Sequence, residues 1–210
     1  MRPENETGGR RRSFIEEARR RQIIAAAVEV ISEVGYGNAS LARIAKRAGI
    51  SKGVISYHFD GKDELMAELV VQLYVSGGEF VGPAVGQAVG ARDKLLTYLD
   101  SNLRFIDANR MYVAAMTDVV INLRNPDGTL RFTSDEGEGP IIKPLIEILR
   151  VGQDSGEFGE FDPVVMAKVL RDTIDGAAGR AIREPDWDVD QYAAEVCRLF
   201  DLATRKGKDE

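Results

Sequence analysis

Hydroxyl and cationic side chains are concentrated between residues 38 and 63, in the stretch NASLARIAKRAGISKGVISYHFDGKD. Apolar residues recur through its first half at helical spacing, as Leu41, Ile44, Ala45 and Ala48. The polar groups between them therefore share the outer surface. Hydroxyl, ammonium and guanidinium groups on one surface are the donors that proteins use to contact phosphate oxygens.

Two short helices joined by a tight turn would position these groups. Ser40 is placed to cap the first helix, and Gly49 stands where the chain must leave it with a positive φ. Ser51 caps the second helix, which Ile55 and Phe59 anchor from below. This pattern predicts a helix-turn-helix, which lays its second helix in the major groove of DNA. An ordinary pair of core helices is the alternative interpretation.

The second helix directs a row of polar and small residues outward. They are Lys52, Gly53, Val54, Ser56, Tyr57 and His58, followed by Lys62 after a turn at Asp60-Gly61. The strings GISKGVISYHF at 49–59 and GKDEL at 61–65 resemble the pattern of the TetR family of transcriptional regulators. The resemblance extends over about residues 15–70 in sequence and over the remainder only in architecture.

This resemblance implies a three-helix DNA-binding domain followed by a larger helical domain for ligand binding and dimerisation. We expect a disordered arm over residues 1–12, the DNA-binding domain over 13–61, and the ligand-binding and dimerisation domain over 62–210. Matching positions imply which residues contact operator DNA. Ser40, Tyr57, His58 and Lys62 would hold phosphates, while Lys52, Gly53, Val54 and Ser56 would face the bases, with Ser51 beside them and Arg43 as a second candidate for guanine.

Two positions depart from the usual family pattern and limit direct base reading. Many members have Thr where this chain has Val54, and Tyr where it has Ser56. A valine can pack on a thymine methyl group but cannot hydrogen-bond to a base edge. Part of the specificity is therefore expected to come from the shape of the DNA.

The charge distribution supports DNA binding at one end of the chain. The whole sequence carries a net charge of −6. Residues 1–62 hold 12 Lys and Arg against 7 Asp and Glu, whereas residues 63–210 hold 16 against 27. Basic charge beside the helix-turn-helix and an acidic remainder fit a DNA reader with a solvated sensory domain.

The composition argues against an enzyme. His58 is the only histidine, so a histidine triad or a multi-histidine metal site lacks its other members. No Walker or dinucleotide-binding glycine loop occurs, so we expect no catalytic residues, metal or cofactor. Cys197 is the only cysteine and no apolar run is long enough to span a membrane, which predicts a cytoplasmic protein with a buried thiol.

Helical periodicity continues to the C-terminus, and the predicted class is all-α. Helices are expected over about residues 13–34, from 62, over 92–109, 112–124, 140–154 and 163–183, and from 189 onward. Asp162-Pro163 and Asp188 are the clearest helix starts. Glycines at positions 77, 78, 82, 86 and 90 are expected to weaken or break the helix that begins near 62.

The sequence indicates the residues for ligand binding and for dimerisation less clearly than those for DNA binding. A sensor needs an apolar site with a few polar groups, and the relatives line it with the corresponding helices. The candidates for ligand contact are Tyr74, Phe80, Tyr98, Phe105, Met111, Tyr112 and Met116, although aromatic and methionine side chains at helical spacing more often belong to a core. The last two helices would form the dimer as a four-helix bundle, through Gly176, Ala177, Gly179, Tyr192, Val196 and Phe200.

The resemblance therefore predicts a homodimer that represses from a palindromic operator and is released by a largely apolar small molecule. An activator, a ligand-independent regulator, or a helical protein-binding scaffold without DNA affinity remain the alternatives. Salt-dependent DNA binding separates a regulator from a scaffold, because phosphate contacts lose affinity steeply as salt is added.

Overall fold

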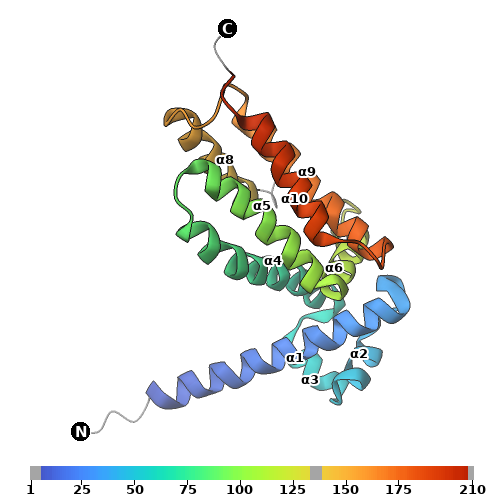
Figure 1. Cartoon of the computed structure of the whole chain (residues 1–210). Helices are drawn as coiled ribbons and strands as arrows, with labels where there is room; N and C mark the ends of the chain where they lie inside the picture. The colour runs from blue at the N-terminus through green and yellow to red at the C-terminus, as the bar shows by residue number, and fades with distance from the viewer. Residues whose placement is uncertain (1–5, 133–138, 208–210) are drawn as a thin grey trace, which may run out of the picture. The chain divides into compact units, whose positions relative to one another are not determined.

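The computed structural model describes residues 6–132 and 139–207, and helices make up its regular structure apart from two isolated β-bridges. The predicted all-α class is confirmed. In chain order the helices are α1 (Glu6–Asn38), α2 (Leu41–Ala48), α3 (Lys52–His58), α4 (Gly61–Gln87), α5 (Ala91–Ala108), α6 (Arg110–Asn122), α8 (Gly139–Asp154), α9 (Pro163–Arg183) and α10 (Val189–Thr204) (Figure 1).

The chain forms two compact units. The first comprises residues through 73 together with 115–131, and the second comprises 74–114 and the residues from 132 onward. Both α4 and α6 contribute residues to each unit. The units therefore do not coincide with the expected boundary at 61/62, because the first half of α4 and the second half of α6 pack with the helix-turn-helix.

The core of the first unit explains why its short helices are stable. Helices of seven or eight residues are marginal alone and need tertiary packing. Each contributes apolar residues to a core formed with α1 and α4. Its fully buried members include Ile23, Ala27, Ile44, Ile55, Leu65 and Leu69.

Both ends of α1 differ from expectation. The helix begins at Glu6, so residues 6–12 are helical and not a disordered arm, while residues 1–5 lie outside the described residues. At the other end Gly35 has φ 75° and ψ 161°, a kink after which the chain makes one more turn to Asn38.

The second half of α4 is also more regular than the sequence predicts. It remains helical to Gln87 with Pro83 inside it. A Cβ at Gly77 would stand 3.4 Å from the ring of Phe105, so this glycine permits close packing of α4 on α5. Packing thus compensates for a helix propensity deficit of about 1 kcal/mol per glycine.

Helix α5 occupies the centre of the second unit and packs against α8, α9 and α10 (Figure 1). Its inward stripe is Leu95, Leu99 and Leu103, each no more than 1% exposed. The predicted starts at Asp162 and Asp188 are confirmed, because both carboxylates accept hydrogen bonds from backbone N–H groups in the first turn of their helices.

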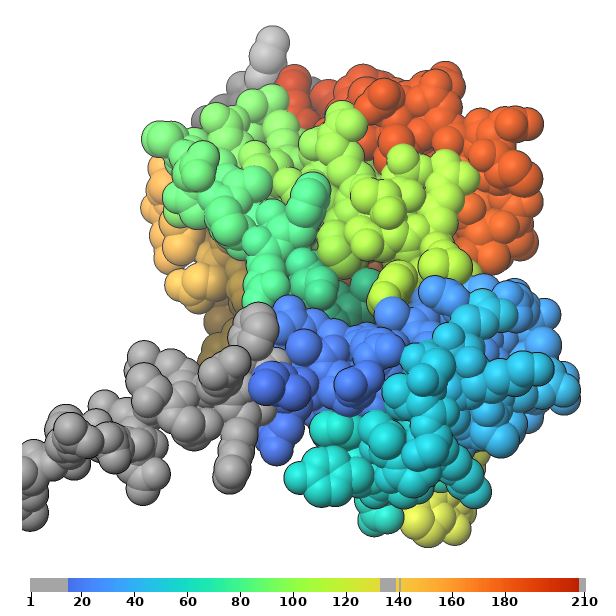
Figure 2. Space-filling model, turned by 90° about the horizontal axis from the view of Figure 1, so that it is seen from below, coloured from blue at the N-terminus to red at the C-terminus, as the bar shows by residue number. Residues whose placement is uncertain are grey.

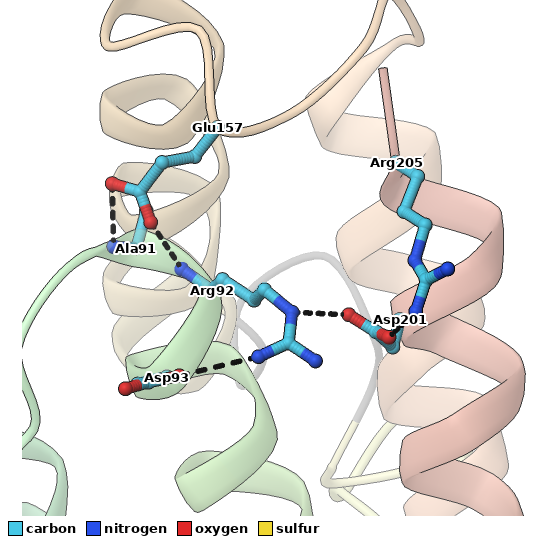
Figure 3. Close-up of polar contacts among 6 residues, drawn as sticks. All are labelled: Ala91, Arg92, Asp93, Glu157, Asp201 and Arg205. Carbon is cyan, nitrogen blue, oxygen red and sulfur yellow. Dashed lines mark hydrogen bonds and ion pairs between the residues drawn. The ribbon is translucent and has the colours of Figure 1, made fainter. Parts of the chain in front are cut away.

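A network of charged groups joins three segments at one end of this unit (Figure 3). The Glu157 carboxylate accepts hydrogen bonds from the backbone N–H groups of Ala91 and Arg92, each at 3.1 Å. The Arg92 side chain donates to Asp201 at 2.5 Å, and Asp201 also accepts from Arg205 at 2.6 Å. The network ties the start of α5 to the α8–α9 loop and to the last turn of α10.

Within the described residues, no helix is both long enough and apolar enough to cross a lipid bilayer.

Candidate functional site

Three backbone caps shape the helix-turn-helix. The Ser40 hydroxyl accepts from the N–H of Arg43 at 3.3 Å, and the Ser51 hydroxyl accepts from that of Val54 at 3.4 Å. Gly49 adopts φ 65° and ψ 31°, the left-handed conformation predicted for the turn. The capping roles of Ser40, Gly49 and Ser51 are therefore confirmed.

Helix α1 holds both short helices through their C-terminal carbonyls. The Arg20 guanidinium donates to the carbonyl of His58 at 2.5 Å, lies 4.2 Å above the Phe59 ring and pairs with Glu68 at 3.4 Å. Gln22 donates to the carbonyl of Ala48 at 2.9 Å, at the end of α2. Two side chains of α1 thus fix the ends of α2 and α3, a role that sequence analysis missed.

Arg47 is a cation of α2 that faces α1. Its guanidinium pairs with Glu29 at 2.9 Å and with Glu33 at 2.5 Å. Hydrogen bonds from Arg47 lower the pKa of the Glu33 carboxyl, so the group stays ionised in this pair. Arg47 therefore orients α2 on α1.

The outward face of α3 carries the predicted contact residues. Lys52, Gly53, Ser56 and Tyr57 are exposed, and Val54 is half-buried. The Tyr57 side chain is 76% exposed, with its ring edge-on to His58 at a centroid distance of 5.0 Å. Figure 2 shows this segment, in cyan, uncovered on the side that faces the viewer. A large exposed aromatic beside cations is typical of a binding surface.

Gly53 has space around it that its own chain does not fill. A Cβ at this position would meet only the Ser51 hydroxyl, at an ordinary 3.7 Å, and its φ is not positive. The fold therefore does not require a glycine here, which fits a position that a partner approaches closely.

Lys62 lies differently from the other predicted contact residues. Its ammonium donates to the carbonyl of Tyr36 at 2.6 Å and stands 4.1 Å above the Tyr36 ring. Burial lowers the pKa of Lys62, with Asp63 and Asp118 opposing that effect. The Tyr36 N–H donates to the Asp118 carboxylate at 2.7 Å. Lys62 and Asp118 thus clamp the turn after Gly35 from α4 and α6.

The predicted ligand residues separate into groups. Met116 belongs to the first unit, and the others belong to the second. Phe80 and Phe105 pack with their ring centroids 5.8 Å apart. Tyr74 and Tyr98 both lie close to the guanidinium of Arg171, a residue that sequence analysis did not select. Met111 is 47% exposed.

The predicted dimer residues differ in how far their own chain covers them. Ala177 and Val196 are buried within their own chain, at 0% and 5% exposure, because they face the helices beside them. Tyr192 packs on Trp187 with a centroid distance of 5.3 Å. Gly176 is exposed, whereas Gly179 and Phe200 are partly covered. Large apolar residues that do remain exposed on α9 and α10 are Val164, Val165, Val169, Ile182, Leu199 and Leu202.

The described residues include no cluster of three or more His, Cys, Asp or Glu side chains suited to a metal ion. The single thiol, Cys197, lies half-buried and contacts the carbonyl of Leu96 at 3.6 Å. Burial raises the pKa of this thiol to about 11, which keeps it protonated at neutral pH.

Comparison with known proteins agrees with this geometry. The profile described as "Bacterial regulatory proteins, tetR family" matches residues 23–69. The HTH-type transcriptional regulator BetI 1 of Chromohalobacter salexigens is 40% identical over 93 residues, which are 44% of this chain and 46% of that protein. The chain thus spans less than half of that relative's length.

Two fatty acid regulators match over greater lengths. The fatty acid metabolism regulator protein of Bacillus subtilis is 30% identical over 155 residues, covering 73% of this chain and 78% of that protein. The fatty acid degradation regulator FadR of Bacillus halodurans superposes with a TM-score of 0.71 at 25% identity, covering 88% and 98% of the two chains. The chain belongs to the TetR family of bacterial regulatory proteins.

Proposed function

We propose that this protein is a sequence-specific, DNA-binding transcriptional regulator. The observation that carries the proposal is α3, which is capped, held from behind by α1 and left open on its outer face. Lys52, Ser56 and Tyr57 supply an ammonium and two hydroxyls on that face. Arg43 is likewise exposed on α2, and its guanidinium can reach a phosphate or a guanine.

The two parts of the chain are proposed to have the functions that they have in the TetR family. The helix-turn-helix of the first unit contacts DNA, and the second unit binds ligand and dimerises, while α4 and α6 contribute residues to both units. A homodimer places two α3 helices about one helical turn of DNA apart, so that the operator is a palindrome. We infer a repressor in the cytoplasm without enzymatic activity, and an activator is the second candidate.

The effector is proposed to be a long-chain acyl-CoA. Two of the relatives that match this chain over most of their length are named as regulators of fatty acid metabolism and degradation. The FadR of Bacillus subtilis, 25% identical with a TM-score of 0.71, was solved in complex with stearoyl-CoA. An apolar chain also suits the aromatic side chains that α4 and α5 place in the second unit.

Fluorescence anisotropy tests DNA binding directly. Labelled duplexes tiled from the DNA flanking the gene are titrated with protein near physiological salt, with a scrambled duplex as control. A regulator binds one tile tightly, with two protomers or a multiple of two per site, and loses affinity steeply as salt rises. Binding that is absent, or equal and weak on every tile including the scrambled one, would contradict the proposal.

The same complex tests the effector. Stearoyl-CoA is added to the assembled operator complex, and CoA with free stearate serves as the control. Release by stearoyl-CoA alone supports an acyl-responsive repressor. A ligand shifts the equilibrium only if it binds the two states with different affinity, so an unchanged complex at saturating ligand would contradict this effector.

A further inference from the structure

Arg171 is a charged side chain in the interior of the second unit. It lies in the middle of α9, and its side chain is 12% exposed. The arginines in the other ion pairs of residues 6–132 and 139–207 all have side chains at least 28% exposed. Burying a charge costs several kcal/mol unless it is paired, so stability alone does not favour arginine at this position.

Three groups from three helices surround the guanidinium. Asp175, one turn along α9, accepts from Nε at 3.1 Å and from Nη2. Tyr98 of α5 and Tyr74 of α4 both lie near enough to Arg171 to affect its charge. Burial lowers the pKa of Arg171, but Asp175 together with Tyr98 and Tyr74 more than offsets that effect, so the group stays charged.

The balance of charge determines which ligand group suits this cluster. Asp175 already neutralises the guanidinium, although its own side chain is 55% exposed. A guanidinium has five N–H donors, and the two bonds to Asp175 leave donors that can serve other acceptors. A second carboxylate would bring an unbalanced negative charge into the interior, whereas a neutral carbonyl oxygen would not.

Two aromatic side chains lie further along the same helices. Tyr98 and Phe105 are seven residues apart on α5, hence on one face and separated by about 10 Å. Phe80 of α4 packs against Phe105 and is 51% exposed. A ligand with one polar group and an extended apolar chain fits this arrangement, because its polar group can bind at Tyr98 while its chain contacts the aromatic rings two turns away.

We propose that Arg171 and Tyr98 form the anchor for the thioester carbonyl of an acyl-CoA effector, with the acyl chain directed along α5 toward Phe105. This inference rests on the proposed function, because it assumes an acyl effector. The anchor selects a neutral acyl carbonyl over the carboxylate of the free acid.

A pair of ligands that differ only at the carbonyl tests the anchor. Palmitoyl-CoA carries the thioester, whereas S-hexadecyl-CoA is the thioether of the same chain length and lacks the carbonyl oxygen. Calorimetry measures both dissociation constants for the wild type, Arg171→Gln and Tyr98→Phe, with circular dichroism to verify folding. The matched control is Arg180→Gln, which removes an arginine from a similar pair with Glu184 on the same helix at 46% exposure.

The wild type should bind palmitoyl-CoA about 5–10-fold more tightly than the thioether, the value of one hydrogen bond of 1–1.4 kcal/mol. That ratio should fall toward one in Arg171→Gln, fall partly in Tyr98→Phe and persist in Arg180→Gln. Because the ratio is taken within each variant, a general loss of affinity does not imitate it. Should Arg171→Gln fail to fold, Tyr98→Phe, which removes only a hydroxyl, gives the same test.

Asp175→Asn tests the charge argument. Without its carboxylate the guanidinium is no longer neutralised, so free palmitate should gain affinity about tenfold or more relative to palmitoyl-CoA. If the wild type binds tightly but the ratio of the dissociation constants of the two CoA ligands is the same in every protein, the proposed anchor is wrong. The proposal of an acyl effector would not be affected by that result. Failure of the wild type to bind either CoA ligand would overturn both.

Discussion

Single residues of α1 determine how α3 is presented, and Arg20 carries most of this effect. Its guanidinium combines a carbonyl cap at His58, a cation–π contact with Phe59 and an ion pair with Glu68. We expect Arg20→Gln to lower the free energy of unfolding by about 1–2 kcal/mol. Operator affinity should also fall, because the end of α3 loses its anchor. Urea unfolding followed by circular dichroism, and anisotropy on the operator, measure the two effects.

Arg21→Gln is the matched control for this prediction. The Arg21 side chain is 55% exposed and pairs only loosely with Glu17 at 3.5 Å. Removing it changes the net charge by the same amount, but the unfolding free energy should change by no more than about 0.5 kcal/mol. Equal losses in the two variants would show that charge, not the position of α3, is responsible.

The residues that sequence analysis identified correctly are those whose role is local. Ser40, Gly49, Ser51, Asp162 and Asp188 act on the backbone within four residues, so spacing alone indicates their function. Arg171 was missed for the opposite reason. A charged residue in a helix normally predicts a solvated position, and nothing in the sequence indicates that helices α4 and α5 enclose it. Lys62 shows the same limit, since its contact with Tyr36 joins distant segments.

At the scale of elements, the junction between α1 and α2 depends on one glycine. Gly35 adopts φ 75° and ψ 161°, a backbone conformation that residues other than glycine rarely adopt. We expect Gly35→Ala to lower the free energy of unfolding by roughly 1–3 kcal/mol. The strain lies in the backbone, because the nearest atom to an added Cβ is Asp118 Oδ2 at an ordinary 3.7 Å.

Gly37 provides the comparison two residues away. Its φ is not positive and nothing lies within 4 Å of an added Cβ. Gly37→Ala should therefore be neutral or stabilise the fold by up to about 1 kcal/mol. Chemical denaturation of both variants gives the two values, and a Gly35→Ala protein as stable as the wild type would contradict the assigned backbone conformation.

The start of α5 should make stability depend on pH. Gly90 precedes this helix and has no side chain to cap it, so Glu157 supplies the acceptor from another loop. The backbone N–H groups of Ala91 and Arg92 lower the pKa of the Glu157 carboxyl. Since the pKa in the folded state lies below the unfolded value of about 4, the carboxylate stabilises the fold above that pH. This contribution is lost as the pH falls through the folded-state pKa.

Glu157→Gln should accordingly melt below the wild type at pH 7, and the difference in Tm should shrink as the pH falls below about 4. Thermal melts between pH 7 and pH 3 follow the difference. Glu160→Gln, an exposed position in the same loop, controls for the loss of one negative charge. A difference in Tm that stays constant down to pH 3 would rule out the carboxylate as the cap.

Helix α4 shows that tertiary packing can keep a segment helical although its residues have low helix propensity. Its glycines and Pro83 predict a break, yet the helix continues to Gln87. Packing on α5 accompanies this continuation, since the ring of Phe105 lies 3.4 Å from where a Cβ of Gly77 would stand, an ordinary contact distance. Such compensation between distant residues is not visible in a single sequence.

For the whole molecule, the separation of charge is consistent with the proposed assembly. Residues 1–62 carry 12 basic and 7 acidic side chains, and the remainder carries 16 and 27. A dimer formed through the acidic part brings two basic ends to one DNA duplex, while the acidic parts disfavour non-specific contact with it. The ranges of α9 and α10 were predictable, but the residues that each helix leaves exposed were not, because periodicity does not reveal which side of a helix the chain itself covers.

Exposed apolar residues on α9 and α10 define the dimer surface that we propose in place of Ala177 and Val196. Val169 and Leu199 are 47% and 51% exposed, and Val165 and Leu202 extend the same type of surface. An aspartate at the centre of an apolar interface is buried without a partner, so Val169→Asp and Leu199→Asp should each yield monomers in sedimentation velocity.

These monomers should bind the operator with a loss of affinity on the order of 100-fold, because each half-site is then contacted separately. Val89→Asp is the control, since Val89 is 84% exposed in the connection between α4 and α5 and belongs to neither proposed dimer helix. It introduces the same charge, and it should leave the dimer intact. If Val169→Asp and Leu199→Asp both sediment as dimers, the interface must lie on other helices. In that case neither variant should lose operator affinity.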